Sequence, residues 1–111
     1  MDRTALGKLL NGGYIESYKF DLRRNELVLQ VDVLENGVLS RFDAEFSDVS
    51  QLVFETESTS AGDRLEVTEI WVDSAPEASS SEEWTIVISM WDLTHLRIRC
   101  AAVTIDGEAL R

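Results

Sequence analysis

Cysteine, proline and histidine are nearly absent from this sequence, which holds one residue of each among 111. A single cysteine, Cys100, cannot form an intramolecular disulfide and agrees with a reducing compartment. A single histidine, His95, leaves no cluster of imidazole and thiol groups at the spacing that zinc sites need. Acid–base catalysis relies most often on histidine, so few catalytic arrangements are open to this chain.

The recognisable motifs of catalytic and ligand sites are missing as well. The sequence contains no glycine-rich phosphate loop, no nucleophile elbow and no calcium loop of the D-x-D-x-D-G type. Cys100 lies among alternating apolar residues without a neighbouring base, which is typical of a buried, unreactive thiol. We therefore expect no catalytic residue, no metal ion, no cofactor and no enzymatic activity.

Long apolar runs are also absent. No window approaches the roughly eighteen continuous apolar residues of a membrane-spanning helix. Charged residues and glycines interrupt the start of the chain, where a secretion signal would lie. These absences predict a cytoplasmic protein without a membrane partner.

Basic residues are few, with 10 against 21 acidic ones and a formal net charge of −11 at pH 7. The excess lies in residues 26–83, which carry fifteen acidic and two basic residues, whereas the flanking segments carry +2 and zero. A field of this sign repels phosphate backbones, so nucleic acid is not an expected partner. It attracts a basic protein or a cationic ligand, although solubility alone also explains an acidic surface.

The clearest positive signal is a β-hairpin between Glu26 and Phe46. Apolar and mostly polar residues alternate on both sides of Asn36-Gly37, and this period of two is typical of half-buried strands. Asn-Gly is the pair that best accommodates the positive φ angles of a type I′ turn. The predicted fold is built around this hairpin.

The same alternation indicates five further strands, and leucines at helical spacing indicate one short helix. The strands are expected within residues 14–22, 52–55, 65–72, 84–91 and 95–105, and the helix over 4–11. Their parity breaks near Glu16-Ser17, Thr68-Glu69 and Ala101-Ala102; the first two breaks indicate β-bulges or bends.

Seven short strands with little helix predict a single all-β domain over residues 1–111, mainly antiparallel. The expected architecture is a sandwich or a partly open barrel with one short N-terminal helix. Short links between consecutive strands predict that sequential neighbours pair. Asp106-Gly107 is expected to end the ordered chain.

A candidate partner-binding surface combines the acidic side of the hairpin with an acidic segment and one tryptophan. Three carboxylates of the hairpin share the parity opposite its core residues, which predicts one solvent-side acidic face. Residues 73–83 hold four acids, four serines and the only proline, a composition typical of an exposed connection. The candidate residues are Asp32, Asp43, Glu45, Glu77, Glu82, Glu83 and Trp91.

The three tryptophans are more than the core of so small a protein requires. Two are expected in the core, while Trp91 has the parity opposite its buried neighbours and is expected to be partly exposed. Exposed tryptophan is favoured in binding sites because it buries much area at low entropic cost. The sequence also allows a homodimer that forms through Trp91 or through unpaired strand edges.

Two functions follow from these observations. The first is a non-enzymatic protein-interaction module whose acidic β-surface binds a basic partner by electrostatic complementarity. The alternative is a small-molecule or peptide binding module, with a tryptophan-lined pocket between the helix and the sheet.

Four stretches of the chain resemble a known family. Residues 14–21 (YIESYKFD), 26–31 (ELVLQV), 46–54 (FSDVSQLVF) and 96–103 (LRIRCAAV) are similar to the YxiG-like group of small bacterial β-proteins. Members of this group are sometimes found beside toxin genes. The resemblance implies a bacterial protein with an immunity-type role, and it carries over no site residues.

Overall fold

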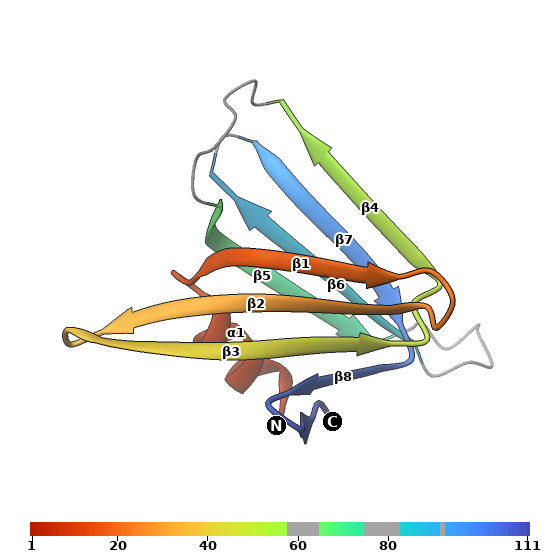
Figure 1. Ribbon diagram of the computed structural model, residues 1–111, viewed down its shortest axis with the longest axis horizontal. Coiled ribbons are helices and arrows are strands. Elements are labelled where there is room, and N and C mark those ends of the chain that lie inside the picture. The colour runs from red at the N-terminus through yellow and green to blue at the C-terminus, as the bar shows by residue number, and fades with distance from the viewer. Residues whose placement is uncertain (58–64, 75–82, 92) are drawn as a thin grey trace.

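A computed structural model describes residues 1–57, 65–74, 83–91 and 93–111. In this part of the chain one short helix accompanies nine strands, so the fold is all-β and mainly antiparallel (Figure 1). The elements are α1 (Arg3–Leu10), β1 (Tyr14–Asp21), β2 (Glu26–Glu35), β3 (Val38–Ser47), β4 (Gln51–Thr56), β5 (Leu65–Ser74), β6 (Trp84–Met90), β7 (Thr94–Cys100), β8 (Ala102–Ile105) and β9 (Glu108–Ala109).

All nine strands belong to one open sheet, in the order β4-β7-β6-β5-β1-β2-β3-β8-β9. Strands β1 to β3 cross over β4 to β7, so the sheet folds into two halves that face each other (Figure 1). The halves meet where Tyr14 and Ile15 of β1 pair with Glu66 and Leu65 of β5. Two backbone bonds extend this junction, from Gly12 N to Val67 O (2.9 Å) and from Val67 N to Gly13 O (2.7 Å).

The hairpin predicted between Glu26 and Phe46 is confirmed as β2 and β3. Asn36 and Gly37 have φ angles of 51° and 77°, as a type I′ turn requires. Their turn sets the register, which pairs Leu34 with Leu39 and continues to Leu27 and Phe46. The far end of the hairpin projects from the body of the molecule (Figure 1), and its apolar tip is exposed.

Helix α1 closes one side of the core. It begins at Arg3, because the side chain of Asp2 caps it by accepting a hydrogen bond from Ala5 N at 2.8 Å. Leu6 and Leu10 are fully buried, and the helix contacts β5. A helix of eight residues is too short to persist alone, so this burial stabilises it.

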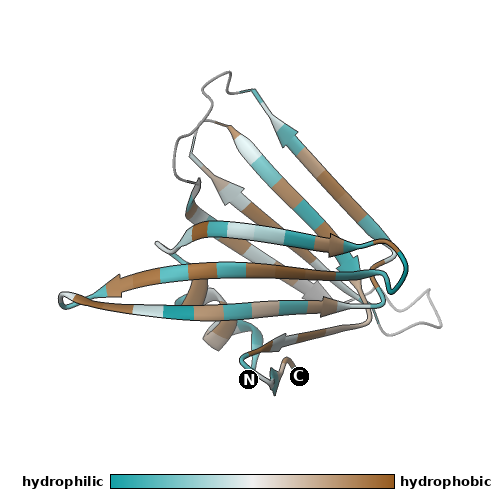
Figure 2. Ribbon diagram, in the orientation of Figure 1, coloured by the Kyte–Doolittle hydropathy of each residue, from teal (hydrophilic) through white to brown (hydrophobic). Residues whose placement is uncertain are grey.

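The core lies between the two halves of the sheet. Hydrophobic and hydrophilic residues alternate along β3 and β7 (Figure 2), and beyond the exposed hairpin tip the hydrophobic members are the more buried ones. The largest fully buried side chains are Phe46, Leu6, Leu10, Leu27, Leu29, Ile86, Ile88 and Ile98.

Both predicted bulges are confirmed by register shifts between Ile15 and Ser17 in β1 and between Val67 and Glu69 in β5. The parity break at Ala101-Ala102 is instead the point where the chain leaves β7 and enters β8 on the other half of the sheet. The predicted seventh strand is therefore two strands. This crossing is one reason why the described strands number nine and not seven.

Two further expectations are wrong. Asp106-Gly107 does not end the ordered chain: with φ angles of 48° and 84° it forms a turn into β9, and Leu110 beyond it is buried. Sequential neighbours do not always pair, because β4 pairs with β7 and β8 with β3. The corner at residues 48–50, where Asp48 has a positive φ of 51°, carries the chain from one half of the sheet to the other.

Gly13 fills the tight space between α1, β1 and β2, and its replacement tests this packing. A Cβ atom at Gly13 would lie 2.8 Å from Val31 Cγ1 and 3.1 Å from the carbonyl oxygen of Leu10. We expect Gly13→Ala to lower the free energy of unfolding by about 1–3 kcal/mol because the core must shift to accept the methyl group. Urea denaturation measures the change.

Gly7→Ala is the matched control for this substitution. A Cβ at Gly7 meets Ile70 Cγ2 at 3.6 Å, an ordinary contact. Because alanine favours a helix interior over glycine, we expect Gly7→Ala to raise the stability by roughly 0.5–1 kcal/mol. Equal stability of the two variants would contradict the packing described for Gly13.

Candidate functional site

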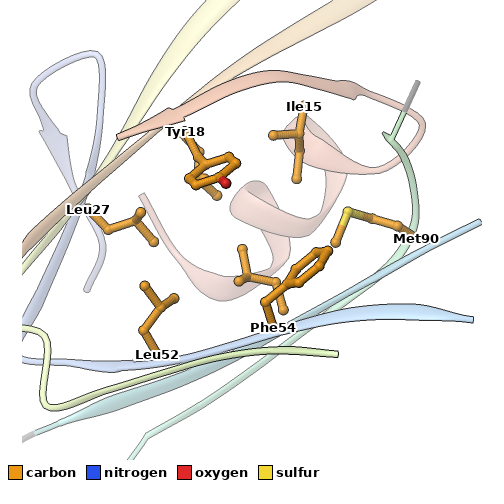
Figure 3. Close-up of a pocket in the computed structure, with 8 residues that line it drawn as sticks. Ile15, Tyr18, Leu27, Leu52, Phe54 and Met90 are labelled. Atoms are coloured by element: carbon orange, nitrogen blue, oxygen red, sulfur yellow. The ribbon is translucent and has the colours of Figure 1, made fainter. Parts of the chain in front are cut away.

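An apolar cleft of about 170 Å³ lies between the two halves of the sheet (Figure 3). One wall comes from β1 and β2, and the other from β4, β6 and β7. The side chains of the two walls point toward one another. The lining residues are Ile15, Tyr18, Leu27, Leu29, Leu52, Phe54, Met90 and Leu96.

The cleft lies beside the short pairing between β1 and β5 that the described residues make. Their register covers Tyr14 and Ile15, and the bulge that follows in β1 turns the strand away. Beyond that point β1 crosses above β6, β7 and β4 (Figure 1). The cleft between the two halves of the sheet is open to solvent, and Tyr18 and Phe54 are 75% and 57% exposed.

Two strand edges accompany the cleft. In the described part of the chain, β4 ends the sheet and pairs with β7 on one side. Residues 17–21 of β1 pair with β2, and no described strand occupies their other side. Unpaired edges present backbone N–H and C=O groups that an added strand can bind.

The lining of the cleft is almost wholly apolar. Its walls present hydrocarbon groups, the thioether of Met90 and the phenol of Tyr18. The volume is below the roughly 300–1,000 Å³ of ordinary small-molecule sites and close to the about 150 Å³ of a cavity that holds benzene. One aromatic or branched aliphatic side chain fills such a space.

Asp32, predicted on the solvent-side acidic face, is instead buried, with 7% of its surface exposed. It accepts hydrogen bonds from Arg41 Nε at 2.7 Å and from Arg41 Nη2 at 3.0 Å. These bonds and the charge of Asp32 raise the pKa of Arg41. The pair neutralises Asp32, so this carboxylate is not a free acidic contact.

Asp43 and Glu45 lie on the same face of the hairpin as Asp32, and both are exposed, as their parity predicts. The backbone N–H of Asp43 donates to Asp106 Oδ1 at 2.9 Å, and Thr104 Oγ1 donates to Glu45 Oε2 at 3.4 Å. The acidic face is therefore present but holds fewer free charges than the sequence predicts.

The other candidate residues do not join this face. Glu83, partly buried, forms an ion pair with Arg99 at 3.2 Å. Trp91 follows β6 and is 62% exposed, which confirms its predicted exposure. Glu77 and Glu82 lie outside the described residues. The described candidates are thus spread over separate elements and form no single surface.

The tryptophans differ from expectation in two respects. Trp71 is 65% exposed, so of the three only Trp84 packs against the core; the guanidinium of Arg3 lies 5.6 Å from its ring centroid. The eight residues that line the cleft include no tryptophan, and α1 contributes none of them. This cleft, aliphatic and aromatic and placed between the sheet halves, is therefore not the tryptophan-lined pocket predicted between helix and sheet.

His95 and Cys100, the two titratable groups considered for catalysis, differ in their surroundings. His95 is exposed, with its Nδ1 atom 3.1 Å from Ser89 Oγ. Cys100 is fully buried, and burial raises the pKa of its thiol to about 12. Among the described residues no group of three His, Cys, Asp or Glu side chains is placed to hold a metal ion. No described helix is both long and apolar enough to span a bilayer.

Comparison with family models and with curated proteins finds no match. The resemblance to the YxiG-like group therefore stays a prediction.

The buried thiol offers a direct check of the core. With a pKa of about 12, on the order of one Cys100 thiol in ten thousand is ionised at pH 8, and thiolate is the reactive form. We expect native protein to react with a chromogenic disulfide reagent far more slowly than the same protein in urea. Comparable rates in the two solutions would contradict the burial of Cys100.

Proposed function

We propose that this chain is a non-enzymatic protein-interaction module that binds an extended segment of a basic partner. One apolar side chain of that segment enters the cleft, while its backbone runs along the free edge of β1 or β4. The observation that carries the proposal is the open apolar cleft flanked by two strand edges that no described strand pairs with.

The size of the cleft favours a side chain over a free small molecule. A space of about 170 Å³ accepts one anchor residue, and such buried anchors supply much of the binding energy at protein interfaces. Tyr18 and Phe54, exposed at the cleft, gain burial when the anchor enters. Added backbone hydrogen bonds along a strand edge give the affinity that a single anchor lacks.

The charge of the chain favours a basic partner. A net charge of −11 at pH 7 attracts cationic proteins over a distance and speeds their association at low salt. Asp43 and Glu45 contribute exposed carboxylates to this field. An immunity-type inhibitor of a basic toxin, as the YxiG-like resemblance implies, is one form of this function.

Binding of a small apolar molecule is the second candidate. It is favoured by the lining of the cleft, whose eight side chains carry one polar hydroxyl group among them. Such a ligand would occupy the cleft without using the strand edges. The two candidate functions differ in one respect: a peptide partner forms backbone hydrogen bonds with a strand edge, and a small molecule does not.

Selection from a phage-displayed library of random peptides tests the proposed interaction. We expect selected peptides to share an aromatic or branched aliphatic residue and a net positive charge, and to bind more weakly at high salt. Fluorescence anisotropy of the labelled peptides then compares two variants, each replacing an exposed apolar residue. Phe54→Glu places a charge at the cleft, and Leu39→Glu places one at the distant hairpin tip.

We expect Phe54→Glu to weaken binding by about tenfold or more, because the anchor pocket loses an apolar wall. Leu39→Glu should bind as the parent does. Both positions are exposed, so the fold should survive both changes, which circular dichroism verifies. Selected peptides that bind all three proteins equally, or that lack any apolar residue, would refute the proposal.

A further inference from the structure

A second hollow, of about 490 Å³, lies at the end of β5, β6 and β7. Its floor is a row of three residues paired across these strands: Glu69, Ser89 and His95. These side chains point away from the core, since the neighbouring positions Met90 and Leu96 are buried. The lining residues are Thr68, Glu69, Ser89, Met90, Trp91, Leu93 and His95.

Trp91 forms an aromatic wall of this hollow. Its indole Nε1 donates a hydrogen bond to Glu66 Oε2 at 2.8 Å, and its backbone N–H donates to Glu66 O at 3.3 Å. These two bonds tie Trp91 to Glu66 of β5 while 62% of the residue stays exposed. An exposed aromatic ring that is already ordered binds a flat group without a further entropic cost of ordering.

Glu69 supplies a carboxylate beside this wall. It is exposed on the floor of the hollow, and no described basic residue forms an ion pair with it. His95, across the floor, is within hydrogen-bond distance of Ser89. The hollow thus offers an aromatic face and a carboxylate that no described basic residue pairs with, which together fit a cation.

Met90, at the end of β6, lines both the hollow and the apolar cleft, which lie on opposite faces of the sheet. A partner segment anchored in the cleft can continue around the end of β6 and place a nearby side chain beside Trp91. The chemistry of the two neighbouring sites then specifies two residues of the partner: an apolar anchor and a basic residue.

We propose that this hollow binds an arginine side chain of the partner segment, with the guanidinium stacked on Trp91 and paired with Glu69. This inference rests on the proposed function, since it assigns the basic residue of the same partner. Arginine fits better than lysine because its planar guanidinium stacks on an aromatic ring and pairs with a carboxylate through two parallel hydrogen bonds.

Titration with N-acetyl-arginine amide, followed through the tryptophan indole N–H signals in ¹H–¹⁵N spectra, tests the assignment. Trp91→Phe identifies the Trp91 signal by its loss. N-acetyl-citrulline amide, a neutral molecule of nearly the same shape, and N-acetyl-lysine amide are the comparison probes. We expect arginine to shift the Trp91 signal with saturation, lysine to bind more weakly, and citrulline to leave the signal in place.

Glu69→Gln removes the charge from the hollow and should weaken arginine binding by roughly three- to tenfold. The matched control is Glu35→Gln, which neutralises an exposed acid at the distant hairpin tip and should change nothing. Equal shifts with arginine and citrulline, equal affinity for lysine, or equal effects of the two substitutions would overturn the assignment. So would a Trp91 signal that does not move.

The outcomes for the hollow and for the cleft are independent. The titration uses single amino-acid derivatives that do not need the cleft, so its failure leaves the peptide result with Phe54→Glu intact. Conversely, the library can fail to yield a peptide while arginine still shifts the Trp91 signal. That result would support the arginine site in the hollow and refute the proposed use of the cleft.

Discussion

The short pairing between β1 and β5 is the constraint on which the rest of the structure depends. Among the described residues, two pairs, Tyr14 with Glu66 and Ile15 with Leu65, join the halves of the sheet, and a bulge follows in β1. Longer pairing would keep all strands in one continuous layer with a single buried face. The early separation lets one half fold over the other, so that both halves bury their apolar faces against each other and against α1.

The same separation leaves part of that apolar surface unburied. Where the halves diverge, Tyr18 and Phe54 are more than half exposed above a lining of leucine, isoleucine and methionine. Removing apolar surface from water is favourable by about 25 cal/mol per Å². Folding leaves the cleft exposed, so a partner that fills it gains this free energy on binding. The acidic charge of the chain then selects which partners approach, and the hollow beside Trp91 adds a specific contact for one of them.

The sequence predicts those features that depend on neighbouring residues. Period-two alternation and Asn36-Gly37 predict the β2–β3 hairpin, and breaks of parity predict both bulges. The Arg41 partner of Asp32 also follows from the hairpin, because a turn at Asn36-Gly37 places these two residues opposite each other. The exposure of Trp71 also follows from parity: Trp71 alternates with Ile70 and Val72, just as Trp91 alternates with its buried neighbours. By contrast, the pairing of β4 with β7, the crossing into β8 and the cleft depend on how distant segments meet, which no local pattern encodes.

Backbone hydrogen exchange of the free protein tests most directly whether the sheet is open along β1. Amides of residues 17–21 that bond to β2 are expected to exchange slowly, and those on the opposite edge to exchange fast, so protection should alternate along the strand. Protection of the Leu27–Val31 amides, which lie between two paired strands, serves as the reference. Uniform protection of residues 17–21 would mean that a strand already covers this edge, and it would contradict the open cleft on which the proposed function rests.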